Sequence, residues 1–147
     1  MLKLLTAGLL ALSPAAPAEP TGFSPQGVYL FHTDAQIEEQ PVCSELWDFV
    51  SNDVLLIKSG AERVRKSYRV KRDSDGVWIV SRTLETNGAP DCMGERNPDP
   101  SPDERRTYVI PMNDGRTRVC PAPATTESGA PFISNCFGWL VPADQAG

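Results

Sequence analysis

The sequence is poor in the side chains that most enzymes and metal sites use. It contains one histidine, His32, and none of its four cysteines forms a C-x-x-C pair. The closely spaced Cys and His ligands of a zinc site are therefore missing. The chain also lacks a G-x-S-x-G motif, the turn that exposes a catalytic serine in many hydrolases. We expect a protein that is not an enzyme and that has no metal site and no cofactor.

Long hydrophobic runs are absent as well. The longest apolar stretch, residues 4–12, is too short to span a bilayer, which needs about 20 apolar residues. It follows Lys3 and precedes small residues at Ala16 and Ala18, which is the layout of a secretory signal peptide. No cysteine follows it at the position that a lipoprotein signal requires. The pattern predicts a signal peptide over residues 1–18 and a periplasmic or secreted domain over 19–147, without a membrane span.

Positive charge is also in short supply, since 19 Asp and Glu residues face 14 Lys and Arg residues. An acidic chain is repelled by phosphate backbones and anionic lipids, so we expect no binding to nucleic acid. The roughly 130 residues after the signal peptide suit one domain with a real core. The sequence has no convincing repeat or domain boundary, and we expect a monomer.

Short runs rich in Val, Ile, Tyr, Trp and Thr alternate with turn-forming clusters such as DSDG and NDG. This rhythm predicts strands near Gly27–His32, Leu46–Val50, Val54–Lys58, Glu62–Arg72, Val77–Glu85, Arg106–Met112, Arg116–Cys120 and Phe132–Val141. Short turns join antiparallel neighbours. We therefore expect an all-β fold, an antiparallel meander of about eight strands that closes into a small barrel or a flattened sandwich. A short helical turn between Ala35 and Val50 is the one alternative, although Pro41 interrupts it.

An even number of cysteines in an exported chain predicts two disulfides, for which three pairings exist. Cys43 precedes the Leu46–Val50 strand and Cys92 follows the Val77–Glu85 strand, so both lie at one end of the sheet. Cys120 ends a strand at that end, and Cys136 lies early in the returning strand. We favour Cys43–Cys92 and Cys120–Cys136, with the other pairings open. The second bond clamps a proline-rich loop, which is worth about 3 kcal/mol in the chain-entropy model.

The segment RVRKSYRVKR, residues 63–72, is the clearest strand. Its alternation predicts an outward basic stripe of Arg63, Arg65, Arg69 and Lys71, which we interpret as a solvated face that protects against edge pairing. A docking patch for an acidic partner is the alternative.

The opposite face of the same strand carries Lys66 among Val64, Tyr68 and Val70. A charge inside a barrel is costly unless an ion partner or an anionic ligand meets it. The candidate ligand-binding residues are Lys66, Tyr68, Trp78 and Arg82. The alternative is that Lys66 and Arg82 lie near a rim or on an outward face.

Three further groups of polar side chains are considered as catalytic or metal-binding sites. His32, Asp34 and Ser44 are the members available for a hydrolase triad, but no motif supports one. The carboxylates of Glu38, Glu39 and Glu45 cluster near Cys43, in what reads as a solvated loop. Five acidic residues fill the loop between the fifth and sixth predicted strands, where interleaved prolines argue against a calcium site: Asp91, Glu95, Asp99, Asp103 and Glu104.

The stretch CSELWDFVSNDVLLIKSG resembles small exported bacterial domains of lipocalin-like type. The likeness rests on an early W-x-F strand, Trp47 and Phe49, followed by a strand with Leu55 and Ile57. The chain departs from true lipocalins because Tyr29 stands where their G-x-W motif has tryptophan. The resemblance implies a barrel that holds a small apolar ligand or is packed solid.

Together these patterns predict an exported binding or structural domain whose partner is a small apolar or anionic molecule or an envelope protein. The alternative is a periplasmic protein-interaction or enzyme-inhibitor module with a filled barrel, similar in size and export to the small bacterial lysozyme inhibitors. The sequence specifies neither the ligand nor the presence of a cavity.

Overall fold

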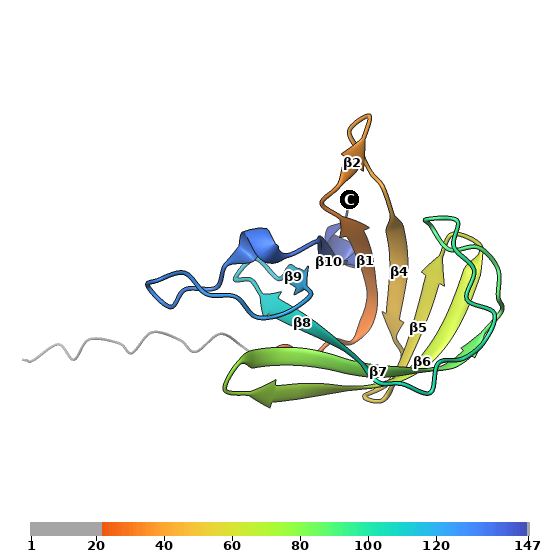
Figure 1. Cartoon of the computed structure of the whole chain (residues 1–147), viewed down its shortest axis with the longest axis horizontal. Helices are drawn as coiled ribbons and strands as arrows, with labels where there is room; N and C mark the ends of the chain where they lie inside the picture. Colours follow the sequence, from red (N-terminus) through yellow and green to blue (C-terminus); the bar gives the residue numbers. More distant parts are fainter. Residues whose placement is uncertain (1–21, 147) are drawn as a thin grey trace, which may run out of the picture.

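The computed structural model describes residues 22–146, which form an eight-stranded antiparallel barrel (Figure 1). The predicted signal peptide, residues 1–18, lies outside the described residues. The barrel strands are β1 (Gly27–Thr33), β4 (Ser44–Phe49), β5 (Val54–Ser59), β6 (Glu62–Asp73), β7 (Gly76–Thr86), β8 (Arg105–Pro111), β9 (Thr117–Cys120) and β10 (Gly138–Pro142). The smaller elements are the hairpin strands β2 (Gln36–Ile37) and β3 (Gln40–Pro41) and the 3₁₀ turns η1 (Ile133–Asn135) and η2 (Ala143–Gln145).

The predicted meander closes because its first strand pairs with its last. β1 lies between β4 and β10, and every other barrel strand pairs with its neighbours along the chain. Closure leaves no unpaired edge for another chain to extend. The prediction of an all-β meander is confirmed, with the barrel as its form. Within residues 22–146 no helix has the length and apolar character to cross a membrane.

Two segments differ from the predicted strands. The strand predicted over Phe132–Val141 is wrong in its first half, because residues 132–137 form η1 and loop, and only Gly138–Pro142 is extended in the sheet. The helical turn considered between Ala35 and Val50 is absent, since that segment forms the β2–β3 hairpin and then β4. The hairpin projects from one end of the barrel (Figure 1). It is a separate two-stranded sheet, so Pro41 interrupts no barrel ladder.

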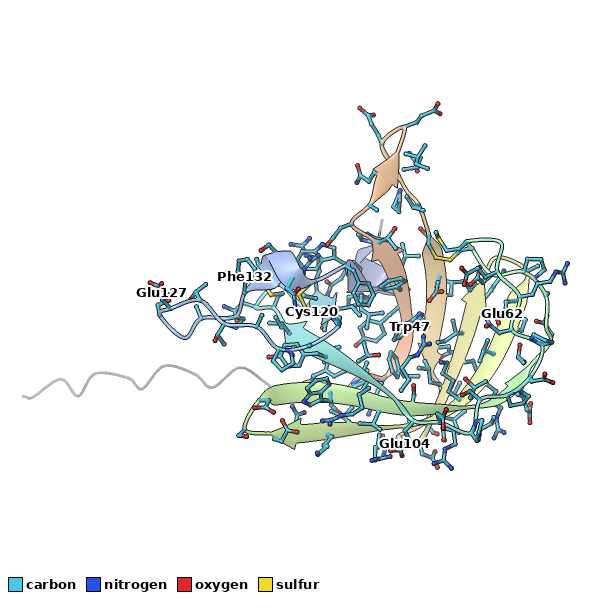
Figure 2. The ribbon with its side chains drawn as sticks, in the orientation of Figure 1. Trp47, Glu62, Glu104, Cys120, Glu127 and Phe132 are labelled. Carbon is cyan, nitrogen blue, oxygen red and sulfur yellow. A yellow bond between two sulfur atoms is a disulfide. The ribbon has the colours of Figure 1, made fainter. Side chains whose placement is uncertain are left out.

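Apolar side chains from alternate strand positions fill the barrel interior. The buried cluster comprises Phe23, Phe31, Phe49, Leu55, Ile57, Tyr68, Ile79, Val109, Val119 and Leu140. Trp47 joins it from β4, stacked on Phe31 with ring centroids 5.6 Å apart (Figure 2). Phe49 makes edge contacts with Tyr29 and Tyr68 at 5.5 and 5.1 Å. This aromatic network packs the space in which a lipocalin-like carrier would hold its ligand.

A second buried cluster lies on the outer wall of the barrel and explains why β7 is apolar on both faces. It contains Trp78, Val80, Tyr108, Cys120 and Cys136. Trp78 pairs in register with Tyr108, which in turn pairs with Cys120. The loop that carries Cys136 therefore packs against the outside of β7, β8 and β9.

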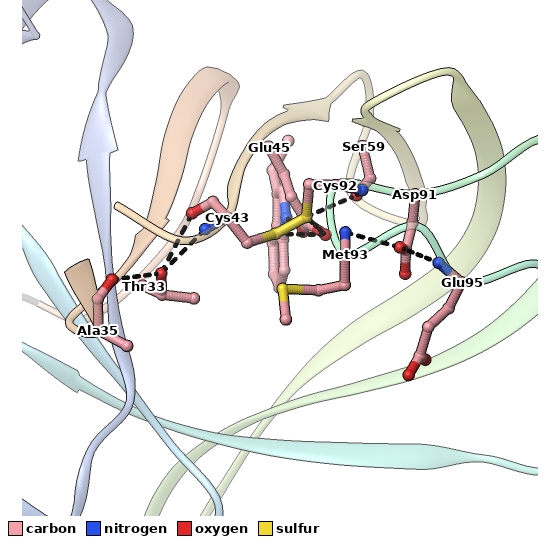
Figure 3. Close-up of a disulfide and its surroundings, with 10 residues drawn as sticks. Thr33, Ala35, Cys43, Glu45, Ser59, Asp91, Cys92, Met93 and Glu95 are labelled. Atoms are coloured by element: carbon pink, nitrogen blue, oxygen red, sulfur yellow. Dashed lines mark hydrogen bonds between the residues drawn. A yellow bond between two sulfur atoms is a disulfide. The ribbon is translucent and has the colours of Figure 1, made fainter. Parts of the chain in front are cut away.

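The disulfides are Cys43–Cys92 and Cys120–Cys136, as predicted. Their Cα atoms lie 5.2 and 3.9 Å apart. The first bond ties the start of β4 to the loop that follows β7, and the second closes the loop between β9 and β10. Figure 3 shows the first bond beside Glu45 and Ser59. The Ser59 hydroxyl lies 3.1 Å from the sulfur of Cys92 and accepts a hydrogen bond from its backbone N–H at the same distance.

Candidate functional site

Lys66 points into the barrel, as its neighbours in sequence predicted. It pairs with Leu55 of β5 and Thr83 of β7, and Leu55 is almost fully buried in the core. No carboxylate of residues 22–146 lies within 4 Å of its ammonium group. Lys66 is thus a half-buried inward charge without a direct ion partner in the described chain.

The charges around Lys66 make this end of the interior polar. Burial, with the nearby Arg105 guanidinium, lowers the pKa of Lys66, while Glu45 and Glu62 oppose that shift. Glu62 is 7% exposed, and burial raises its pKa, aided by Asp91 and Glu45. One oxygen of Glu45 accepts a 2.7 Å hydrogen bond from the indole nitrogen of Trp47. The two cations and three carboxylates of this cluster leave no surplus of positive charge, which gives little basis for an anion-binding site.

Of the four predicted ligand-binding residues, only Tyr68 and Arg82 border a common recess among those described, so the structure does not bring the four together. Tyr68 pairs with Ser81, which places Lys66 and Tyr68 inside, whereas Trp78 and Arg82 lie on the outer face of β7. The Tyr68 hydroxyl donates to the Ser51 carbonyl at 2.8 Å. The outer apolar cluster makes the outward face of β7 look like a core face in the sequence, which is why Trp78 and Arg82 were grouped with Lys66.

On the outside, Trp78 and Arg82 have different surroundings. The Trp78 ring lies 4.3 Å beneath the Arg106 guanidinium. Its indole nitrogen donates to Asp73 at 3.3 Å. Arg82 is exposed and borders a recess of about 230 Å³ beside Arg69 and Glu104. The outward alternative is therefore correct for Arg82.

The basic stripe lies on the outer face of β6, as predicted, and most of it is ion-paired. Arg65 lies 3.4 Å from Glu85, Arg69 2.6 Å from Glu104 and Lys71 3.3 Å from Asp73. The interpretation as protection of a sheet edge is wrong, because β6 lies between β5 and β7 in a closed barrel. Arg63 is the member of the stripe with no carboxylate within 4 Å in the described chain.

The residues considered for a triad have other contacts. His32 and Ser44 are register partners on β1 and β4, but no hydrogen bond joins their side chains in residues 22–146. Both carboxylate oxygens of Asp34 accept hydrogen bonds from Arg118, at 2.8 and 2.6 Å. The Arg118 hydrogen bond holds the pKa of Asp34 below its usual range. Arg118 is buried, and its guanidinium lies 4.3 Å from the centroid of the Trp139 ring. Asp34 is therefore part of a structural ion pair.

Three of the acidic groups near the first disulfide and in the long loop, Glu45, Asp91 and Glu104, have structural partners. The carboxylate of Asp91 accepts backbone hydrogen bonds from Met93 and Glu95 at 2.8 and 2.9 Å, which shapes the turn (Figure 3). Glu104 pairs with Arg69. Cys43, Glu45 and Cys92 lie close enough together to suggest metal ligands. Their sulfur atoms are joined in a disulfide and are not the thiolates that a metal would bind.

A groove lies on the outer wall of the barrel, and no sequence pattern predicted it. It has a volume of about 600 Å³ and crosses β1, β4, β5, β6 and the end of β7. Its apolar floor includes Val28, Leu46 and Leu56, which are 41%, 40% and 39% exposed. Charged side chains border the floor: Asp48, Lys58, Arg63, Arg65 and Glu85. The sequence signal that could have indicated the groove is the presence of Leu46 and Leu56 at outward positions of strands whose inward positions are also apolar.

Volumes of this size suit small-molecule sites, which usually measure about 300–1,000 Å³.

Comparisons of the chain with protein-family models, curated proteins and solved structures found no match. The lipocalin-like resemblance therefore stays a prediction, and the functional argument rests on the geometry of this chain.

Proposed function

We propose that this protein is an exported, non-enzymatic binding domain that holds a small apolar ligand on the outside of its barrel. The observation that carries the proposal is the groove of about 600 Å³ with Val28, Leu46 and Leu56 on its floor. Leucines exposed side by side on a barrel wall lose contact with water when a ligand covers them, which favours binding by about 25 cal/mol per Å² of apolar area. The packed aromatic interior supports an external site over an internal one.

The place of action that we propose is the periplasm or the extracellular medium. Two disulfides join all four cysteines, and such bonds persist in oxidising compartments. An outer-wall site in that setting is open to ligands that diffuse freely, with no lid to displace.

A titration with N-phenyl-1-naphthylamine, a neutral dye whose fluorescence rises in apolar sites, tests the proposal. We expect saturable one-site binding that Leu56→Ser weakens about fivefold, since it removes much of the apolar floor. Leu84→Ser is the matched control, because Leu84 is also 39% exposed on the outer wall but does not border the groove. Absence of binding, or equal losses in both variants, would overturn the proposal.

A second candidate is a protein-interaction module, favoured by apolar side chains at the tips of projecting segments. Ile37 of the β2–β3 hairpin is 67% exposed. Phe132, Ile133 and Phe137 are also exposed on the loop that precedes β10. If this candidate is correct as an inhibitor module, the protein lowers the activity of a lysozyme and Ile37→Ser relieves the inhibition.

A further inference from the structure

We infer that the ligand of the outer groove is a free single-chain amphiphile with an acidic head. Its head group lies at Lys58 and Arg63, and its chain covers Leu46 and Leu56. The inference rests on the proposed function and deepens it by assigning the chemistry of the ligand.

The first argument is the pairing of two positive charges. Lys58 on β5 and Arg63 on β6 are register partners on the outer face, and both border the groove. Like charges at directly opposed positions destabilise a sheet. In residues 22–146 no carboxylate lies within 4 Å of either side chain. An acidic group bound between them removes this repulsion.

The second argument is that Arg63 is held in position before any ligand arrives. Its Nη1 atom donates to the backbone carbonyls of Gly60 and Glu62 at 3.1 and 2.7 Å. Its backbone N–H donates to the side-chain oxygen of Asn87 at 2.9 Å. The other guanidinium nitrogens of Arg63 have no hydrogen-bond partner within the described chain. A guanidinium fixed in this way gives up little conformational entropy when it binds an acid.

The third argument is the distribution of the remaining charges, which makes one end of the groove cationic and leaves the rest apolar or acidic. Leu46 pairs in register with Lys58, so apolar floor begins directly beside the cationic pair. Asp48 pairs with both Val28 and Leu56 and repels a second acidic group there. Arg65 is already paired with Glu85. A molecule with one acidic end and one apolar end matches this order of side chains.

The net charge of the chain distinguishes a free amphiphile from a membrane surface. At a formal charge of −5 the protein is repelled by an anionic bilayer, whereas one bound acid needs only the local pair of cations. The occupant is therefore a dissolved monomer of the amphiphile.

Competition against bound N-phenyl-1-naphthylamine tests the head group. Dodecanoate and dodecanol share a chain and differ in charge, and each is added below the concentration at which it self-associates. We expect dodecanoate to displace the dye at an about fivefold lower concentration than dodecanol, the effect of one exposed ion pair. Lys58→Gln/Arg63→Gln should abolish this advantage, so that dodecanoate and dodecanol displace the dye at equal concentrations.

The matched control is Arg69→Gln/Lys71→Gln, which removes two cations from the same face of β6 outside the groove. It should keep the preference for dodecanoate. If the dye binds but the two competitors are equally effective, or if both double variants lose the preference alike, the head-group assignment is overturned and the apolar site stands. If the dye does not bind at all, both the assignment and the proposed function are overturned.

Discussion

At the scale of single residues, Lys66 shows how a barrel tolerates an inward charge. The net effect of its surroundings on its pKa is downward, because burial and Arg105 outweigh the attraction of Glu45 and Glu62. A lowered lysine pKa means that the charged form is less stable in the folded chain than in the unfolded chain. Lys66 therefore weakens the fold at neutral pH.

Replacing Lys66 by methionine should raise the free energy of unfolding by about 1 kcal/mol at pH 7, because the substitution keeps an unbranched side chain one atom shorter and removes the charge. Urea denaturation measures the change. The gain should shrink as the pH rises from the lowered pKa toward 10.5, the ordinary lysine value, because the unfolded lysine then loses its proton too. Lys71→Met, at an exposed ion-paired position, should bring no gain. A loss of stability in Lys66→Met would contradict this account.

The residue patterns predicted correctly which side chains share a face of a strand. They predicted less well which of the two faces points into the barrel. Arg63, Arg65, Arg69 and Lys71 share the outer face of β6, and Lys66 lies opposite them. On β7 both faces are apolar, since Ile79 enters the main core and Trp78 the outer cluster. Alternation alone does not choose between two buried faces, so the position of Trp78 and Arg82 depended on contacts distant in sequence.

At the scale of elements, the projecting β2–β3 hairpin carries a turn that suits its residues poorly. Glu38 and Glu39 form the two-residue connection and have φ angles of 50° and 65°. Positive φ at both positions is typical of a type I′ turn, which favours Asn-Gly because side chains with a Cβ are strained there. Such strain is often kept at binding sites, and Ile37 at the same tip is exposed.

The double substitution Glu38→Asn/Glu39→Gly should therefore stabilise the protein by about 1 kcal/mol, measured by urea denaturation. Glu38→Ala/Glu39→Ala is the control, because it removes the same two charges but keeps both Cβ atoms at positive φ. It should give no gain. Equal stabilisation by both variants would mean that the turn is destabilised by charge repulsion between the glutamates and not by backbone strain.

Strand prediction succeeded where a turn signal separated two alternating runs and failed beside the second disulfide. β6 and β7 flank DSDG and match their predicted ranges closely. Phe132 and Ile133 look like the start of a strand, but they lie in a loop whose end is tied to β9 by Cys120–Cys136. The outer groove was missed for a related reason, since exposed leucines on a wall resemble core leucines in the sequence.

At the scale of the whole molecule, the defining feature is that the first and last strands close the barrel. Tyr29 near the start of β1 pairs with Pro142 at the end of β10, so the start of β1 and the end of β10 lie at the same end of the barrel. The long connection between β7 and β8 is exposed over residues 93–104 and contributes no barrel strand. The β1–β10 pairing therefore closes the barrel, and the β7–β8 connection is a place where the chain can be cut without removing a strand pairing.

A circular permutant should therefore fold when residue 146 is joined to residue 22 by a flexible glycine-serine linker and the chain is opened between Pro100 and Ser101. Every barrel pairing survives, so we expect cooperative urea unfolding within about 2 kcal/mol of the parent. A chain that ends at Phe137 is the informative contrast, because it loses β10, including the fully buried Leu140, and leaves β1 and β9 as open edges. It should show no cooperative transition. If the shortened chain unfolds as sharply as the parent, closure by β10 is not what holds the sheet together.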